Sequence, residues 1–445
     1  MPAQKVLIIG GGAAGTSCAF ELRKLDKEVE IIILEKGSHL EYSPCALPYV
    51  LSGEIGSFDD IFIFKKEDYE NNNIQIFLNT SAEKIDRKAK KIICSTAQKK
   101  MEISYDKLVL AIGGAPRFPS IKGLDKLDPA TLKTITDARQ IQKNVSRGDS
   151  SAVIGAGLIG LELAVALKKS GEKVSVLDIK DRPLPYLLDK DMSRQVSEYL
   201  NNLGIDLFFN SDIDRVDQKQ IYLGGDRLNF DKIYLCTGME ANFDLAQRAG
   251  LETKEAIEVN DKLQSSDKNI YACGDCVLST EFNTEKRILS QLGTIAVRQG
   301  RVVAQNILGR NVRTPKVLNN TITKIGDLFV GSVGLSLDRS KEEGWKSVAA
   351  RYSGEVRSEY YPPSSLISVK VISDKSGKVI GGQIIGREEV VGRLNLLSLA
   401  IEKGMNLDDL IGMETCYNPA SAPINEPLNM VADLCKKKLS LLSDE

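Results

Sequence analysis

The feature that most constrains the fold is a strand–turn–helix–strand unit that occurs twice. In the first copy, residues 5–10 are apolar and β-branched, which predicts a buried parallel strand. Gly10-Gly11-Gly12-Ala13-Ala14-Gly15 follows, then an expected helix over 14–24 and a second strand over 28–34. Such glycines let a diphosphate approach a helix N-terminus, and an acid about 20 residues further on accepts ribose hydroxyls. The predicted dinucleotide-binding residues are Gly10, Gly12, Ala13, Ala14, Gly15, Glu35 and Lys36.

The second copy starts with a strand over 151–154 and continues through Gly155-Ala156-Gly157-Leu158-Ile159-Gly160, a helix over 161–170 and a strand over 173–177. Its acid is Asp178. A carboxylate there pairs with a 2′-hydroxyl and repels a 2′-phosphate, which favours NADH over NADPH. The residues predicted for this site are Gly155, Gly157, Leu158, Ile159, Gly160, Asp178 and Gly238. Two dinucleotide sites in one chain suit an enzyme that passes electrons from a nicotinamide to a flavin.

The remaining segments complete the predicted fold. Residues 74–93 are expected to form short strands, with Ala82 beside the adenine of the first nucleotide. Residues 107–119, which contain Ala111 and Gly113, have the strand, glycine turn and prolines of a crossing between domains, and 232–238 repeats this pattern. A strand over 269–273 ends in Gly274-Asp275, where Asp275 is placed to bond the sugar-like chain of a flavin, and a helix near 290–308 points its N-terminus at the cofactor.

From about residue 320 no nucleotide motif occurs. Antiparallel strands over 321–334 and 366–386 and an amphipathic helix over 389–403 predict an α+β domain for dimer contacts. The fold class is therefore α/β, with two Rossmann-like dinucleotide-binding domains and a C-terminal α+β dimerisation domain. We place the first nucleotide domain at 1–116 with 245–318, the second at 117–244, and the C-terminal domain at 319–445.

The composition limits the partners, the compartment and the metal sites that we expect. The net charge of −1 offers no global field for nucleic acid or an anionic membrane. No apolar run reaches the ~18 residues of a membrane span, and the N-terminus has no signal-peptide pattern. Eight cysteines scattered over 445 residues are not a disulfide framework, so a reducing cytoplasm is expected. The single histidine, His39, excludes a His-rich metal site, and we expect no metal.

Cys45 is the candidate reactive residue. It lies ten residues after Glu35, close to where the redox ring of a bound cofactor is expected. Pro44 ends any preceding helix, so a helix over 46–51 would place Cys45 at its N-terminus, where free N–H groups and the helix dipole lower a thiol pKa. The alternative is a small buried hydrophobic residue. Cys273-Gly274-Asp275-Cys276 is formally C-x-x-C, but we interpret its cysteines as packing residues.

Three tyrosines in the C-terminal domain are candidate proton donors. Tyr360 and Tyr361 precede Pro362-Pro363, and Tyr417 lies in Cys416-Tyr417-Asn418-Pro419. A phenol can donate a proton or a hydrogen bond at a redox centre. The alternative is that these residues are half-buried interface aromatics.

Together these motifs resemble the flavin-dependent pyridine nucleotide-disulfide oxidoreductases over essentially the whole chain. The resemblance implies FAD in the first domain, a nicotinamide nucleotide in the second, and a C-terminal domain that dimerises and contributes to the partner subunit's site. Glutathione and lipoamide reductases use two cysteines separated by four residues and a C-terminal His-Glu pair, and this chain has neither. The NADH peroxidase and oxidase branch uses a histidine on the first helix, which residues 14–24 lack.

The segment Cys45-Ala46-Leu47-Pro48-Tyr49 is similar to the coenzyme A-disulfide reductases, which have one active cysteine. Tyr417 and the 360–361 doublet match their tyrosine pair, and we favour Tyr360. Ser17 and Lys24 fit a coenzyme A contact, whereas Glu21 and Glu41 would repel a phosphorylated ligand. The family's asparagine before the cysteine is Pro44, and Asn425 stands where a basic residue is expected.

The resulting hypothesis is an NADH-dependent, FAD-containing disulfide, persulfide or polysulfide reductase. Cys45 would be the nucleophile, and Tyr417 and Tyr360 of the neighbouring subunit of a homodimer would protonate the leaving thiolate. One alternative is an NADH oxidase that uses oxygen. Another is an electron-transfer subunit that docks on a larger enzyme, and the remotest is an NADH-binding sensor without turnover.

Overall fold

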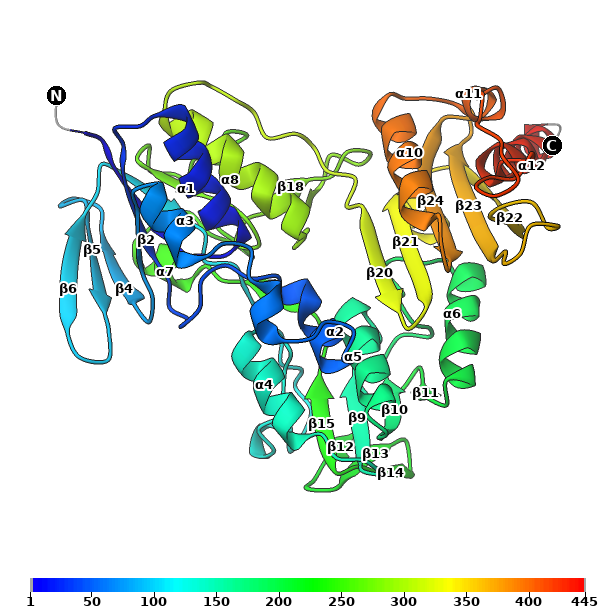
Figure 1. The fold of residues 1–445 in the computed structure, drawn as a ribbon, viewed down its shortest axis with the longest axis horizontal. Helices are drawn as coiled ribbons and strands as arrows, with labels where there is room; N and C mark the ends of the chain where they lie inside the picture. The colour runs from blue at the N-terminus through cyan, green and yellow to red at the C-terminus, as the bar shows by residue number, and fades with distance from the viewer. Residues whose placement is uncertain (1–2, 444–445) are drawn as a thin grey trace.

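The computed structural model describes residues 3–443, in which the three largest sheets are each covered by helices (Figure 1). The first sheet is parallel and has the strand order β17-β7-β1-β2-β3. Its strands are β1 (Lys5–Ile9), β2 (Glu30–Leu34), β3 (Ile74–Phe77), β7 (Lys107–Leu110) and β17 (Ile270–Ala272), and all but the edge strand β3 are buried along most of their length. The predicted strands over 5–10 and 28–34 and the strand that precedes Gly274 are therefore confirmed.

Helices α1 (Ala13–Leu25) and α8 (Gly293–Ile307) pack against each other beside this sheet. A Cβ at Gly300 would lie 2.2 Å from the carbonyl oxygen of Ala14, so only glycine permits this approach. The other end of α1 is held by Arg23, which is buried. Its guanidinium donates hydrogen bonds to five backbone carbonyls, those of Asp26, Lys27, Val29, Asn72 and Asn73. These contacts join α1 to β2 and to the end of α3 (Lys66–Asn71).

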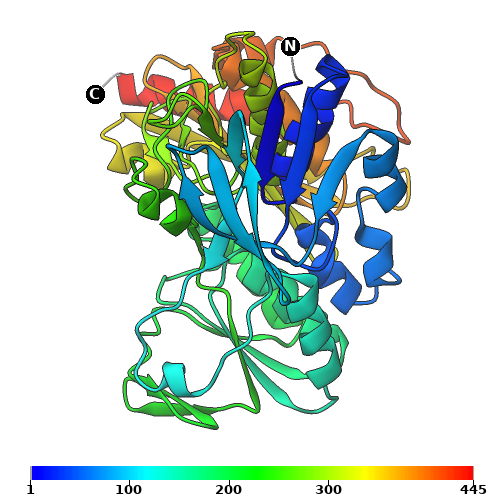
Figure 2. The same cartoon turned by 90° about the vertical axis from the view of Figure 1, so that its left-hand side faces the viewer.

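The second nucleotide unit repeats the first. Its parallel sheet has the order β11-β10-β9-β15 and lies below the first in Figure 2. Its strands are β9 (Ser150–Ile154), β10 (Lys173–Leu177), β11 (Asp206–Phe208) and β15 (Lys232–Leu235), and its helices are α4 (Ile135–Asn144), α5 (Leu158–Lys169) and α6 (Lys190–Asn202).

The two glycine turns have the same geometry. Gly10 and Gly155 have φ of 107° and 110°, which side chains disfavour. A Cβ at Gly15 would lie 1.9 Å from the Gly10 carbonyl oxygen, and one at Gly160 would lie 2.0 Å from that of Gly155. The third glycine of each motif therefore allows the helix to pack against its own turn.

Small antiparallel elements join and flank these sheets. Two strands pair at the crossing between them, β8 (Gly114–Pro116) and β16 (Met239–Ala241). One three-stranded sheet holds β4 (Ser81–Asp86), β5 (Lys91–Ser95) and β6 (Lys100–Ser104), and another holds β12 (Arg215–Val216), β13 (Gln220–Leu223) and β14 (Asp226–Asn229). Shorter elements are α2 (Leu47–Leu51), α7 (Asp244–Arg248), β18 (Ser279–Thr280) and β19 (Arg287–Ile288).

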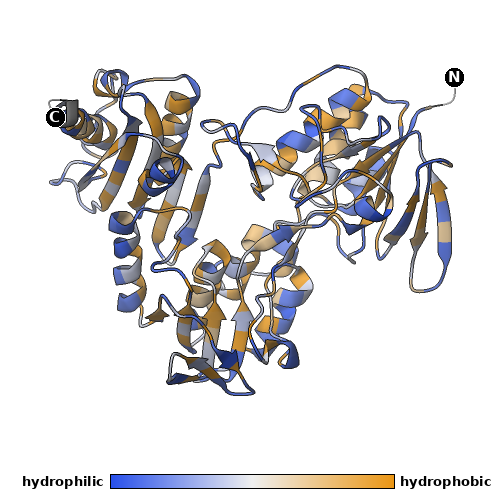
Figure 3. Ribbon diagram, turned by 180° about the vertical axis from the view of Figure 1, so that it is seen from behind, coloured by the Kyte–Doolittle hydropathy of each residue, from blue (hydrophilic) through white to orange (hydrophobic). Residues whose placement is uncertain are grey.

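The C-terminal domain is an antiparallel sheet of order β20-β21-β24-β23-β22. Its strands are β20 (Thr321–Ile325), β21 (Leu328–Gly334), β22 (Ser347–Glu355), β23 (Leu366–Asp374) and β24 (Val379–Gly386), and its helices are α9 (Leu337–Glu342), α10 (Val390–Glu402), α11 (Leu407–Ile411) and α12 (Pro427–Ser443). The central strands are apolar in Figure 3. Strand β22 was not predicted, because its Arg-Tyr-Ser-Gly-Glu half lacks an apolar alternation.

A cluster of charged residues, of which Lys370 and Asp189 are buried, joins this domain to the second nucleotide domain. The Nζ atom of Lys370 on β23 lies 2.9 Å from Asp189 and 2.6 Å from Asp191, at the start of α6. Gln383 on β24 also donates to Asp189, at 3.0 Å. Over the described residues, no helix is both long and apolar enough to cross a membrane.

Candidate functional site

Each nucleotide unit presents an uncapped helix N-terminus. Gly12 precedes α1 and Gly157 precedes α5, and in neither case does a side chain cap the helix. A Cβ at either glycine would meet nothing within 4 Å. Free N–H groups next to open space suit a diphosphate, so both turns fit the dinucleotides that the motifs predict.

The two predicted acids are held against these turns in the same way. Glu35 accepts hydrogen bonds from the N–H groups of Gly11, at 2.7 Å, and Gly37, at 2.6 Å. Asp178 accepts from those of Ala156, at 2.7 Å, and Lys180, at 2.8 Å. Each carboxylate is therefore fixed at the end of its second strand, where a ribose is expected.

Most of the other predicted cofactor residues follow the ends of strands in the two nucleotide domains. Ala111 and Gly113 follow β7, Gly238 follows β15, Gly274 and Asp275 follow β17, Lys36 is exposed beside Glu35, and Ala82 lies in β4. The Asp275 carboxylate lies 3.9 Å from Lys133 Nζ. Burial raises the pKa of Asp275, and Lys133 opposes that shift. The cofactor contacts of these residues stay predictions.

Cys45 lies in a 3₁₀ turn, Pro44–Ala46, which leads into the short helix α2. It is exposed, and so is Cys416, whereas most of the other cysteines are buried. The expected lowering of its pKa is wrong. The surrounding protein raises the pKa of the Cys45 thiol by desolvation, Glu162 adds to the increase, and Lys133 opposes it. A helix of five residues supplies too small a dipole to reverse these effects.

Glu162, in the second turn of α5, joins three parts of the chain. Its Oε1 atom accepts hydrogen bonds from the Tyr49 hydroxyl on α2, at 3.2 Å, and from Thr323 Oγ1 on β20, at 2.5 Å. Burial raises the pKa of Glu162 to about 7. No motif in the sequence singles out Glu162 or Lys133 as a site residue. An acidic residue within the apolar run Leu161–Leu167 is the sequence feature that could have identified Glu162. No comparable feature marks Lys133.

The structure pairs Tyr360, rather than Tyr361, with Tyr417. The hydroxyl oxygens of Tyr360 and Tyr417 are 2.9 Å apart, and either can donate. Hydrogen bonds from Ser358 and Tyr417 lower the pKa of Tyr360. The rings are 72% and 48% exposed. Across residues 3–443, no hydrogen bond connects this pair to Cys45 of the same chain.

The remaining candidates differ in their surroundings. Cys273 and Cys276 are buried, and burial raises the pKa of Cys276 to about 12, which agrees with their interpretation as packing residues. Ser17 is half-buried on α1, and Lys24, 76% exposed, lies 3.9 Å from Glu21.

Glu41 does not present a surface charge. Its side chain is buried, and desolvation raises its pKa to about 7, against a hydrogen bond from Thr16. Glu41 therefore repels a phosphorylated ligand less than the sequence predicts, because this carboxyl is partly protonated at neutral pH.

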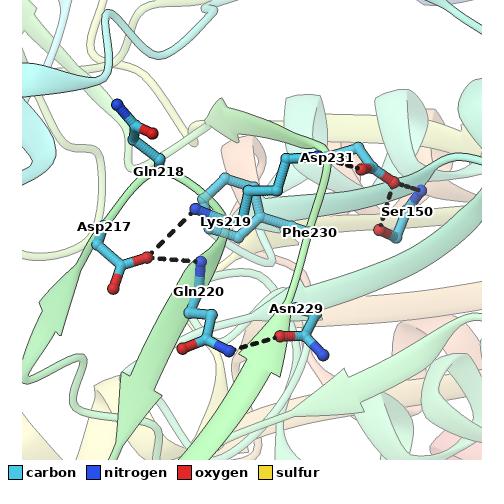
Figure 4. A pocket seen from close by; sticks show the side chains of 8 residues that line it. All are labelled: Ser150, Asp217, Gln218, Lys219, Gln220, Asn229, Phe230 and Asp231. Carbon is cyan, nitrogen blue, oxygen red and sulfur yellow. Dashed lines mark hydrogen bonds and ion pairs between the residues drawn. The ribbon is translucent and has the colours of Figure 1, made fainter.

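A hollow of about 700 Å³ lies away from these residues, on the sheet β12-β13-β14 (Figure 4). Its polar groups bond mainly to one another. Gln220 donates to Asn229 at 2.9 Å, and Asp231 accepts from Ser150 at 2.9 Å. None of the predicted site residues lines it, so it is separate from the candidate site.

This geometry agrees with what comparison with known proteins finds. The family model described as pyridine nucleotide-disulphide oxidoreductase matches residues 4–300, and the model of that family's dimerisation domain matches residues 321–426. The chain belongs to this family and is an oxidoreductase. Membership implies FAD and a pyridine nucleotide as cofactors.

Several relatives align over nearly their whole length. The chain is 40% identical to an NADH oxidase of Methanocaldococcus jannaschii, over 98% of this chain and 99% of that protein. It is 30% identical to a coenzyme A-dependent NAD(P)H sulfur oxidoreductase of Pyrococcus furiosus, over 98% and 100%. Among solved structures, an NAD-dependent persulfide reductase from A. fulgidus matches with a TM-score of 0.93 and 32% identity, over 98% of this chain and 84% of that one.

Proposed function

We propose that the protein is an NADH-dependent reductase of a disulfide, persulfide or polysulfide, and that Cys45 is its single redox-active cysteine. The observation that carries the proposal is the position of Cys45. It is exposed, precedes α2, and lies within the electrostatic reach of Glu162 from the second nucleotide domain and of Lys133 and Asp275. A thiol next to both nucleotide units suits electron transfer between a nicotinamide and a sulfur substrate.

The chemistry of this chain's own residues follows. The Cys45 thiolate attacks one sulfur of the substrate, which forms a mixed disulfide and releases the other sulfur as a thiolate. The paired hydroxyls of Tyr360 and Tyr417 supply the proton that this leaving thiolate needs. FAD, which the turn Gly10–Gly15 and Glu35 would hold, would supply the two-electron redox chemistry between NADH and sulfur. The Cys45 thiolate and a second thiol are thereby regenerated, so that NADH, one proton and a disulfide give NAD⁺ and two thiols.

We infer that the active site is shared between the subunits of a homodimer. The exposed tyrosine pair has no link to Cys45 of its own chain in residues 3–443, and the C-terminal domain matches a dimerisation model. A second copy of the chain would bring such a pair to Cys45. Tyr361 is then an interface residue beside the pair. The domain limits at residues 116, 244 and 318 remain part of the proposal.

We also propose NADH as the preferred donor, because Asp178 is fixed by two backbone N–H groups at the end of β10. A fixed carboxylate favours a ribose 2′-hydroxyl over a 2′-phosphate. The eight free thiols fit a reducing cytoplasm. Ser17 and Lys24 remain candidates for contacting the substrate. Because Glu41 can be protonated near neutral pH, its carboxyl allows a substrate of the coenzyme A type.

A Cys45→Ser variant tests the nucleophile. We expect NADH-dependent disulfide turnover to fall at least 100-fold, because a hydroxyl cannot form the mixed disulfide. In an anaerobic NADH titration, the wild type should accept electrons beyond those that its flavin holds, and the variant should not. Cys416→Ser, which removes the other exposed thiol, is the matched control and should behave as wild type. Full turnover by Cys45→Ser would disprove the assignment.

The second candidate function is an NADH oxidase, which the name of the M. jannaschii relative favours. Measuring oxygen uptake and disulfide reduction on the same preparation distinguishes the oxidase from the reductase. Oxygen consumption that exceeds disulfide turnover at saturating NADH would favour the oxidase.

A further inference from the structure

Thr323 joins the C-terminal domain to the candidate site. Its side chain is 4% exposed, and its hydroxyl donates to the same oxygen of Glu162 that accepts from Tyr49. The Glu162 carboxyl is therefore held by the first nucleotide domain through α2, which follows Cys45, and by the C-terminal domain through β20.

We propose that Thr323 is a positioning residue for Cys45: it fixes the Glu162 carboxyl, which Tyr49 ties to the helix that follows Cys45, and so sets the reactivity of that thiol. The inference rests on the proposed function, because it takes Cys45 as the nucleophile. It adds that a residue of the C-terminal domain acts on Cys45 within the same chain, apart from the tyrosine pair.

Thr323 acts on Cys45 through Glu162, the charged group to which its hydroxyl donates. Glu162 is bonded to Tyr49 from the α2 region and acts electrostatically on Cys45, on which the ion pair of Lys133 and Asp275 acts as well. Lys324, the next residue of β20, instead pairs with Glu54, which also accepts from Lys169 at 2.7 Å. Adjacent strand residues point to opposite faces, so Thr323 and Lys324 join the same three segments through separate contacts.

The sign of the effect follows from these contacts. A hydroxyl that donates to a carboxylate stabilises its charged form, so removing the Thr323 hydroxyl raises the pKa of Glu162. A larger fraction of Glu162 is then neutral near pH 7. Because the Glu162 charge raises the pKa of the Cys45 thiol, losing that charge lowers it. Thr323 therefore keeps the Cys45 pKa high, which makes the thiolate a stronger nucleophile once it forms.

The test uses the FAD-loaded full-length protein, reduced with dithiothreitol and carrying Cys416→Ser, so that Cys45 is the exposed thiol. The rate of iodoacetamide alkylation is measured against pH. For Thr323→Val we expect the Cys45 pKa to fall by about half a unit to one unit, and the rate near pH 7 to rise about threefold. The acidic limb of the kcat profile for disulfide reduction should move in the same direction. Thr323→Ser, which keeps the hydroxyl, and Lys324→Met, which removes only the neighbouring ion pair, should match the parent.

Two results would overturn the inference: a Thr323→Val titration that matches the parent, or an equal shift in Lys324→Met, which would indicate general loosening of the domain contact. Thr323→Ala provides a second variant should Thr323→Val fail to bind FAD, and it carries the same expectation. Failure of the proposed function itself looks different. In that case Cys45 of the parent would not react with iodoacetamide, or Cys45→Ser would keep full turnover.

Discussion

Glu162→Gln tests the electrostatics of the site most directly. The glutamine keeps an Oε1 atom that can accept from Tyr49 and Thr323, so the substitution removes the charge and leaves both hydrogen bonds in place. Burial raises the pKa of Glu162 from 4.5 to about 7. Between these values the folded protein holds a proton that the unfolded chain has lost. Raising the pH through this window therefore lowers the unfolding free energy of the wild type. The glutamine variant lacks this pH-dependent loss.

The magnitude follows from the width of the window. A shift of about 2.5 units corresponds to about 3 kcal/mol at about 1.4 kcal/mol per unit. Relative to the wild type, Glu162→Gln should gain this amount of stability between about pH 5 and about pH 8, with little further gain above. For a domain of 150 to 250 residues, the gain corresponds to roughly 6–12 °C in Tm.

The measurement is thermal unfolding of the FAD-loaded protein, followed by the rise in flavin fluorescence on release, at several pH values and constant ionic strength. Glu402→Gln, at an exposed position on α10, is the control and should show no pH-dependent difference from the wild type. A Glu162→Gln difference in Tm that stays constant across the pH range, or that shrinks as the pH rises, would refute the burial argument.

Three further outcomes are expected. Arg23→Met should lower the unfolding free energy by about 3–5 kcal/mol, because five backbone carbonyls lose a buried charged donor; denaturant melts that agree with the wild type would contradict this. Tyr417→Phe should reduce disulfide kcat roughly 10- to 100-fold with unchanged FAD content, and wild-type kcat would remove the phenol from the chemistry. Asp178→Asn should raise the NADPH to NADH ratio of kcat/KM at least tenfold, and an unchanged ratio would exclude Asp178 as the specificity determinant.

The sequence by itself determined the two nucleotide units and the cysteine that follows the first. Each unit spans about 30 residues, and the strands, Gly10, Gly155, Glu35 and Asp178 are fixed by local spacing that the backbone turn demands. The C-terminal sheet was predicted less completely, because β22 lacks a clear alternation and forms by pairing with β23.

Only the tertiary structure decided what surrounds Cys45 and which phenols pair. Glu162, Lys133 and Thr323 come from segments about 90 to 280 residues away in the chain, and no local pattern marks their convergence. The direction of the Cys45 pKa shift depends on desolvation by the folded protein around it, which outweighs the turn geometry that the sequence predicts. The pairing of Tyr417 with Tyr360 likewise depends on two loops that meet only in the folded domain.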